Sequence, residues 1–171
     1  MTIFQKEIEM KSLLLVALLV TLVVGFLPSI SSAEEQAVQL SLFNPIQIRP
    51  EGTAIKYFRF NLIYGKNTSI VGLDMGLVNH LTAGESKALQ LGFVNFVEAD
   101  LRGLQYGCVN YTKGTFTGWQ WGFVNVSGHT KGFMLGFVNY SESMYGLQIG
   151  LINIIKEGGM LPFFPIFNFS F

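Results

Sequence analysis

Asp74 is the only charged residue that falls inside a repeated segment of this chain from Ser69 onward. Later copies of the segment carry an amide side chain at the equivalent place, and these are Gln90, Gln105, Gln120 and Gln148. A carboxylate and several amides on one strand face could line a lumen that binds or passes a small polar molecule. They could equally hydrogen-bond to one another and fill space, as buried polar groups usually do. Asp74 has no second carboxylate or base near it in the sequence, so the pattern does not predict acid–base catalysis.

The other residues that could support chemistry are two histidines and one cysteine. We expect His80 and His129 to lie in connecting segments, and neither has a second His, Cys or carboxylate at metal-ligand spacing. Cys108 occupies a position that other copies fill with Leu or Phe, so we expect it to pack as a small apolar residue. No serine or threonine stands beside a base in a nucleophile setting. The sequence therefore predicts no enzyme, no metal site and no cofactor.

A Gly-x-x-Asn motif recurs through the chain at nearly constant spacing. Its glycines are Gly76, Gly92, Gly107, Gly122, Gly136 and Gly150. Its asparagines are Asn79, Asn95, Asn110, Asn125, Asn139 and Asn153, separated by 16, 15, 15, 14 and 14 residues. Degenerate copies precede and follow this array. Self-similarity at a fixed period indicates a repeat architecture, in which we expect these glycines and asparagines to have structural roles.

Each copy predicts one β-strand. In residues 118–125, alternation separates a bulky face, which holds Trp119, Trp121 and Phe123, from a face of glycine, glutamine and valine. A helix is disfavoured because each interior glycine costs about 1 kcal/mol relative to alanine. Short segments between the strands, such as 127–130, are rich in the residues that form turns. About 10 residues remain for each strand, which is near the length of a membrane-spanning strand.

Most charges fall in the connecting segments, so neither strand face is suited to bulk water. Two all-β architectures satisfy this pattern. In the first, which we favour, an antiparallel meander closes into a small outer-membrane β-barrel of about 8–10 strands, with the bulky face toward lipid and the glycine–glutamine face inward. In the second, each copy forms one coil of about 14–16 residues in a β-solenoid, with the bulky Leu-x-Ile-x-Leu face inward and the asparagines stacked as a ladder.

The N-terminal part of the chain predicts an export signal. An apolar run extends over residues 13–27, and the small residues 31–33 provide a cleavage site. We therefore expect residues 1–33 to be a signal peptide, of which residues 1–9 could be a start-site extension. Residues 34–171 are expected to form a single β-repeat domain. The formal net charge is zero, so nucleic-acid binding is not expected.

The repeated words, such as Gly-Leu-Gln-Ile-Gly-Leu-Ile-Asn at 146–153, resemble a group of bacterial surface-repeat proteins of the leptospiral type. The resemblance covers residues 72–153 and the Pro-Ile-Phe-Asn-Phe-x-Phe ending. The departures from the pattern are Asp74 and Met134 in place of Gln, Cys108 in place of Leu, and Ala88 in place of Gly. The resemblance implies export to the cell envelope, and it implies no catalytic residues.

Together, these observations predict an exported protein of the outer membrane or cell surface. As a barrel, it would have a structural, adhesive or minor pore role, and membrane lipid would be its partner. As a secreted or surface solenoid, it would instead be an interaction module that binds a protein or a glycan.

Overall fold

A computed structural model of the chain describes residues 35–171. The described residues form one compact unit, and all the ladders and core residues described below lie within it. The predicted signal peptide lies outside the described residues, so its presence and cleavage stay predictions. Within the described part of the chain, no helix has the length and apolar character needed to cross a membrane.

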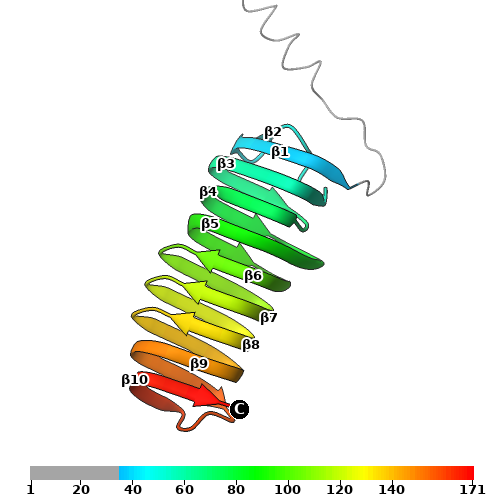
Figure 1. The fold of residues 1–171 in the computed structure, drawn as a ribbon. Coiled ribbons are helices and arrows are strands. Elements are labelled where there is room, and N and C mark those ends of the chain that lie inside the picture. The colour runs from blue at the N-terminus through cyan, green and yellow to red at the C-terminus, as the bar shows by residue number, and fades with distance from the viewer. Residues whose placement is uncertain (1–34) are drawn as a thin grey trace, which may run out of the picture. The chain divides into compact units, whose positions relative to one another are not determined.

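The strands of the described residues form one ten-stranded sheet in the order β10-β9-β8-β7-β6-β5-β4-β3-β1-β2. Their bounds are β1 Gln36–Phe43, β2 Ile46–Gln47, β3 Ile55–Asn67, β4 Val71–Leu81, β5 Glu85–Val97, β6 Asp100–Tyr106, β7 Val109–Trp121, β8 Val124–Leu135, β9 Val138–Glu157 and β10 Phe163–Ser170. Figure 1 shows these strands stacked one above another in nearly the order of the sequence.

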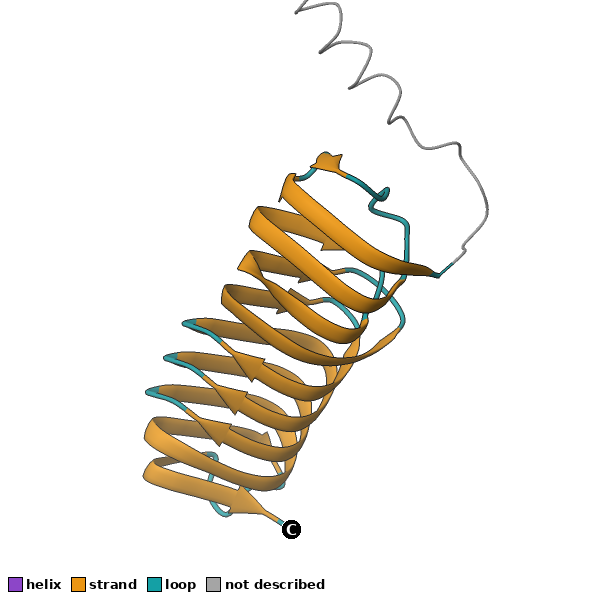
Figure 2. Ribbon diagram, turned by 45° about the horizontal axis from the view of Figure 1, so that its top comes forward, coloured by secondary structure: helices purple, strands orange, loops and turns teal. Residues whose placement is uncertain are grey.

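The sheet is wound into a β-solenoid of about eight turns (Figure 2). Neighbouring strands from β3 to β9 pair in parallel, with β1 also parallel to β3. Equivalent residues of successive copies therefore stack in columns, as Val94 lies beside Val109 and Val109 beside Val124. The solenoid alternative is confirmed. The barrel prediction is wrong, because the predicted barrel is a closed antiparallel meander, whereas these strands pair in parallel and the sheet runs open from β10 to β2.

The turn-rich segments bend the chain, but they do not fold it back into an antiparallel hairpin. In β8 the backbone stays extended through residues 127–130, which the sequence predicts as a turn. The first part of β9 pairs in parallel with β8, and its last part pairs with β10. For the same reason His80 and His129 lie in β4 and β8, not in connecting segments as predicted. Local residues thus indicate a bend, whereas its direction depends on stacking against the next coil.

The small face of each copy points inward and the bulky face outward, which reverses the facing predicted for a solenoid. Gln148 is fully buried, whereas Ile149 and Leu151 are 37% and 63% exposed. A Cβ atom on Gly150 would lie 2.0 Å from the carbonyl oxygen of Gly136, so the coils are too close together there for larger side chains. The facing that we predicted for the barrel, with glycine and glutamine inward, is the one observed.

The interior has an apolar part and a polar part. The apolar part consists of two clusters, one of Ile55, Ile70, Leu81, Ala88, Val97, Leu101 and Phe116, and one of Met134, Met144 and Ile155. The polar part contains the glutamine and asparagine columns. The short antiparallel strand β2 borders β1 at one end of the sheet, and β10 closes the other end antiparallel to β9. Pro165 in β10 sits at a break in the pairing register, where a missing backbone donor is tolerated.

The close approach of the coils can be tested at Gly118, whose φ of +135° lies in a region that other residues rarely adopt. A Cβ atom there would lie 1.9 Å from the carbonyl oxygen of Gly103. We expect Gly118→Ala to lower the free energy of unfolding by about 2–3 kcal/mol, the upper part of the usual range for backbone strain, because overlap adds to it. Urea unfolding followed by circular dichroism measures the change.

Gly52→Ala is the matched control, because no atom lies within 4 Å of the added Cβ and φ is ordinary. It should change the free energy of unfolding by less than about 0.5 kcal/mol. Equal stability of the two variants would contradict the close packing at Gly118.

Candidate functional site

The predicted polar residues of the strand face form one buried column along the solenoid axis. Its members, all without exposed surface, are Asp74, Gln90, Gln105, Gln120 and Gln148. Each Nε2 from Gln90 to Gln120 donates to the preceding member of the column, over 2.8, 2.8 and 2.6 Å. Met134 interrupts the column before Gln148. These side chains are therefore brought together as a stack within the packed interior, and not as a ring around a lumen.

Arg59 completes this column and was not identified from the sequence. Its Nε and Nη2 donate to Oδ1 and Oδ2 of Asp74, both over 2.7 Å, and neither side chain is exposed. Asp74 precedes Asn79 by five residues, whereas Arg59 precedes Asn61 by two, because Asn61 pairs in register with Gly76 and it is Gly65 that lies opposite Asn79. The interval of 18 residues between Asn61 and Asn79 is longer than any between the motif asparagines, and it is the sequence signal that could have revealed this offset.

The motif asparagines form a second buried column, which is the ladder that the solenoid alternative predicts. From Asn79 to Asn153, each Nδ2 donates to the Oδ1 of the next asparagine over 2.8 or 2.9 Å. Most of these amides also donate to a main-chain carbonyl, as Asn110 does to Trp121 over 3.0 Å. Both amide hydrogens are thereby satisfied in the dry interior, which is the condition for burying them without loss of stability.

The motif glycines lie beside the asparagine column, where each coil turns. A Cβ atom on Gly122 would lie 2.2 Å from the carbonyl oxygen of Gly107 and 2.7 Å from Nδ2 of Asn110. Equivalent contacts surround Gly76, Gly92, Gly107, Gly136 and Gly150. The glycines therefore allow the amide ladder to pack directly against the backbone, and they leave a depression on the outer surface of the coil.

His80 joins a short row of polar side chains near the N-terminal end of the solenoid. Its Nδ1 lies 2.8 Å from the Tyr64 hydroxyl, and its Nε2 lies 2.7 Å from Oε1 of Glu98. Burial raises the pKa of Tyr64. The ring of His80 also meets Phe96 edge to face at 4.9 Å, and Phe96 stacks on Tyr111 at 4.8 Å. The row therefore continues as an outward aromatic column of the solenoid.

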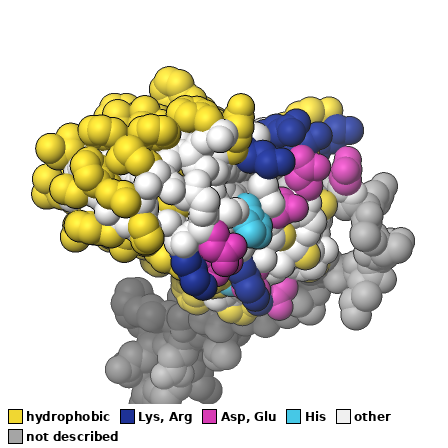
Figure 3. All heavy atoms as spheres, turned by 90° about the horizontal axis from the view of Figure 1, so that it is seen from below, with side chains coloured by type: hydrophobic (Ala, Val, Ile, Leu, Met, Phe, Trp, Pro, Cys, Tyr) yellow, Lys and Arg dark blue, Asp and Glu magenta, His cyan; other side chains and the backbone are white. Residues whose placement is uncertain are grey.

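The largest chemical feature of the described surface is an uncharged apolar flank. It consists of three outward columns: Leu89, Leu104, Trp119, Phe133 and Leu147; Leu91, Tyr106, Trp121, Leu135 and Ile149; and Phe93, Cys108, Phe123, Phe137 and Leu151. Trp119 is 63% exposed and Phe123 is 57% exposed. Figure 3, viewed along the solenoid, shows the hydrophobic side chains gathered on one side and the charged side chains on the other.

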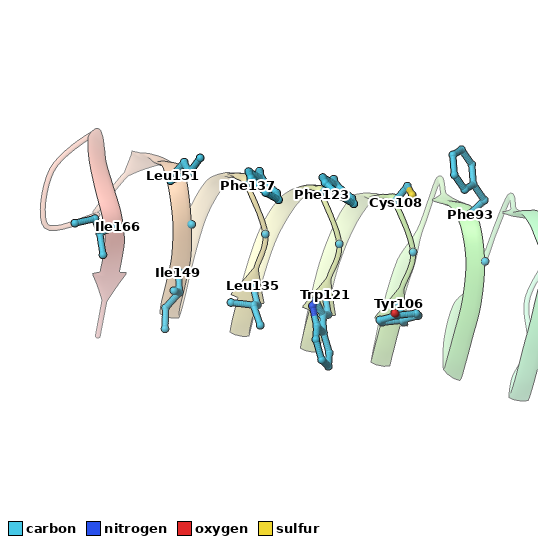
Figure 4. Close-up of a pocket in the computed structure, with 15 residues that line it drawn as sticks. Phe93, Tyr106, Cys108, Trp121, Phe123, Leu135, Phe137, Ile149, Leu151 and Ile166 are labelled. Atoms are coloured by element: carbon cyan, nitrogen blue, oxygen red, sulfur yellow. The ribbon is translucent and has the colours of Figure 1, made fainter.

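A groove with a volume of about 780 Å³ runs along this flank. Its floor consists of Gly92, Gly107, Gly122, Gly136 and Gly150, and its walls are the second apolar column from Tyr106 onward and the third apolar column (Figure 4). The amide nitrogen of Gly107 donates to the carbonyl of Trp121, and that of Gly122 donates to Leu135, over 3.1 and 3.0 Å. These floor amides are therefore not available to a polar ligand. Ile166 lines the end of the groove with a φ of 72°, a strained conformation for a β-branched residue.

Among residues 35–171, no group of three or more His, Cys, Asp or Glu side chains is placed to hold a metal ion. Cys108 is a free, partly exposed thiol in the wall of the groove, so its predicted apolar environment is present on the outer surface of a coil.

Comparison of the chain with protein-family models, with curated proteins and with solved structures finds no match. The properties of the apolar flank are thus the main guide to function.

Proposed function

We propose that this chain is an exported, non-enzymatic surface module that attaches to a lipid bilayer through its apolar flank. The attachment is peripheral, with the flank resting in one leaflet and the charged corner of the solenoid facing water. Export rests on the predicted signal peptide, residues 1–33, and on the resemblance to bacterial surface-repeat proteins. The observation that carries the proposal is the exposure of the aromatic and aliphatic columns, while the amide columns are buried.

The size of the flank supports an apolar partner. Soluble monomers rarely expose a continuous apolar patch of more than a few hundred Å². Here three adjacent columns extend over five coils without a charged member. Fully burying one such side chain contributes about 1.5–3 kcal/mol, so a few of them are enough for stable contact with a bilayer. Tryptophan and tyrosine, which favour the membrane–water interface, lie on the same flank at Trp119, Trp121 and Tyr106.

The flank is less suited to a glycan than to lipid. Sites for polar ligands combine apolar walls with a few placed polar groups that fix orientation. The groove presents aromatic and aliphatic side chains, and the floor amides of Gly107 and Gly122 are engaged with neighbouring coils. An extended aliphatic chain matches this lining, since it makes no hydrogen bonds. Five coils at about 4.8 Å spacing give a groove of about 19 Å, which lies along the bilayer surface when the flank rests in one leaflet.

Vesicle binding by residues 34–171 tests the proposal, because these residues omit the apolar run at 13–27, which could itself bind lipid. Both tryptophans of the chain lie on the flank, so their emission should shift to shorter wavelength when phosphatidylcholine vesicles are added. Phe123→Ser with Phe137→Ser removes two stacked rings from the flank surface. We expect this pair of substitutions to weaken binding at least about tenfold, from the loss of apolar burial.

His129→Ser is the control, since this exposed side chain belongs to β8 but to none of the three apolar columns. It should leave vesicle binding unchanged. If the phenylalanine variant bound vesicles as tightly as the unsubstituted protein, or if neither bound, attachment through the apolar flank would be ruled out.

A further inference from the structure

A column of basic side chains borders the apolar flank on one side. Lys87 pairs in register with Arg102, Arg102 with Thr117, and Thr117 with Lys131. We call Lys87, Arg102 and Lys131 the basic column. All three side chains are exposed, and each lies two residues before a member of the first apolar column. Because alternate residues of a strand share a face, the basic column and the apolar flank point to the same side of the sheet.

The side chains of the basic column form no ion pair within the described residues. The ion pairs among residues 35–171 are Lys56–Glu35, Arg59–Asp74, Lys66–Glu51 and His80–Glu98, and none involves the basic column. Lys87 and Arg102 are direct neighbours on adjacent coils. Like charges placed opposite each other on neighbouring strands are destabilising, so an external anion would relieve this repulsion.

The order of charges across the sheet matches the depth profile of a bilayer surface. Glu85 and Asp100 pair with each other two residues before Lys87 and Arg102, and both carboxylates are exposed. Moving away from the flank, the sheet thus presents apolar, then basic, then acidic side chains. With the flank in hydrocarbon, the basic column would lie at the level of the lipid headgroups and the carboxylates would lie farther out in water.

We propose that the basic column selects anionic lipid headgroups for the bilayer to which the flank attaches. This inference rests on the proposed attachment and names the class of lipid. Each Lys or Arg near an anionic leaflet contributes a factor of about fivefold in affinity. Removal of the three charges should therefore weaken binding to an anionic bilayer on the order of 100-fold.

The test compares vesicles of phosphatidylcholine alone with vesicles of equal parts phosphatidylcholine and phosphatidylglycerol. Residues 34–171 should bind the anionic vesicles more tightly, and added salt should remove the difference by screening. Lys87→Gln with Arg102→Gln and Lys131→Gln should abolish the preference for phosphatidylglycerol while binding to phosphatidylcholine stays unchanged. The matched control is Lys66→Gln with Lys113→Gln and Lys156→Gln, which changes net charge equally at sites outside the basic column.

The outcomes separate this inference from the proposed function. Equal binding of the unsubstituted protein to both kinds of vesicle would overturn the headgroup selection and leave attachment intact. An equal loss in the control variant would also overturn it, because net charge would then explain the effect. Binding to neither kind of vesicle, or self-association without vesicles, would overturn both, since the flank would then have no lipid partner or would be covered by a second copy.

Discussion

Asp74→Ala is expected to lower the free energy of unfolding by about 3–5 kcal/mol, the usual cost of leaving a buried charge without its partner. Both carboxylate oxygens of Asp74 accept from Arg59 over 2.7 Å, and Oδ2 also accepts from Gln90 over 2.8 Å. Loss of the carboxylate leaves the Arg59 guanidinium with the carbonyl of His80 as its closest acceptor, at 3.0 Å. Urea unfolding followed by circular dichroism gives the change.

Glu85→Ala is the control for Asp74→Ala, because the Glu85 carboxylate is exposed and should contribute less than about 0.5 kcal/mol. Replacing the pair together, as Arg59→Met with Asp74→Leu, should recover much of the lost stability, since no buried charge then remains. If the double variant were as unstable as Asp74→Ala, desolvation of Arg59 would not be the cause.

Asn110→Ala is expected to cost about 2–5 kcal/mol, because it leaves more than one buried polar group without a partner, at about 1–3 kcal/mol each. Asn110 accepts from Asn95 over 2.8 Å and donates to Asn125 over 2.9 Å and to the Trp121 carbonyl over 3.0 Å. The substitution interrupts the ladder at its centre. Because each solenoid coil contacts only its neighbours, the damage should appear first as faster hydrogen exchange in β7 and β8.

Asn44→Ala provides the comparison for Asn110→Ala. The Asn44 amide donates to Glu51 in an exposed hydrogen bond outside the ladder, so its removal should change stability by less than about 0.5 kcal/mol. Uniform exchange across all strands in Asn110→Ala would show that the coils unfold as one unit and would refute a local defect.

The buried amides and the exposed apolar flank are two consequences of one arrangement. Glycines on the inner face allow neighbouring coils to lie close together. Amide side chains bridge these coils by hydrogen bonds that repeat along the axis. The bulky side chains are thereby excluded from this part of the interior and stack outside, as Phe123 does on Phe137 at 5.0 Å. The proposed attachment to lipid through this surface therefore needs no cavity to open and no segment to move.

The sequence by itself determined the strands, the period of the repeat and the residues that share a face. Strict alternation places Gln120 and Gly122 on one face and Trp119 and Trp121 on the other, whatever the strand pairs with. The structure keeps this division and makes the motif asparagines a continuous ladder. The local pattern also disfavours helix, because glycine recurs within every copy. Export, lipid attachment and the absence of catalysis stay predictions.

Only the tertiary structure decided how the strands pair and which face is inside. A bend looks the same in sequence whether the chain turns back beside itself or continues around a coil, so the barrel and the solenoid could not be separated. The inward face depended on how closely the coils approach at the glycines, since a Cβ atom on Gly150 would lie 2.0 Å from the carbonyl oxygen of Gly136. The pairing of Arg59 with Asp74 depended on the alignment of β3 with β4, in which Asn61 lies opposite Gly76 and not opposite Asn79. These outcomes arise from contacts between residues more than a dozen positions apart, and a period-2 pattern carries no information about them.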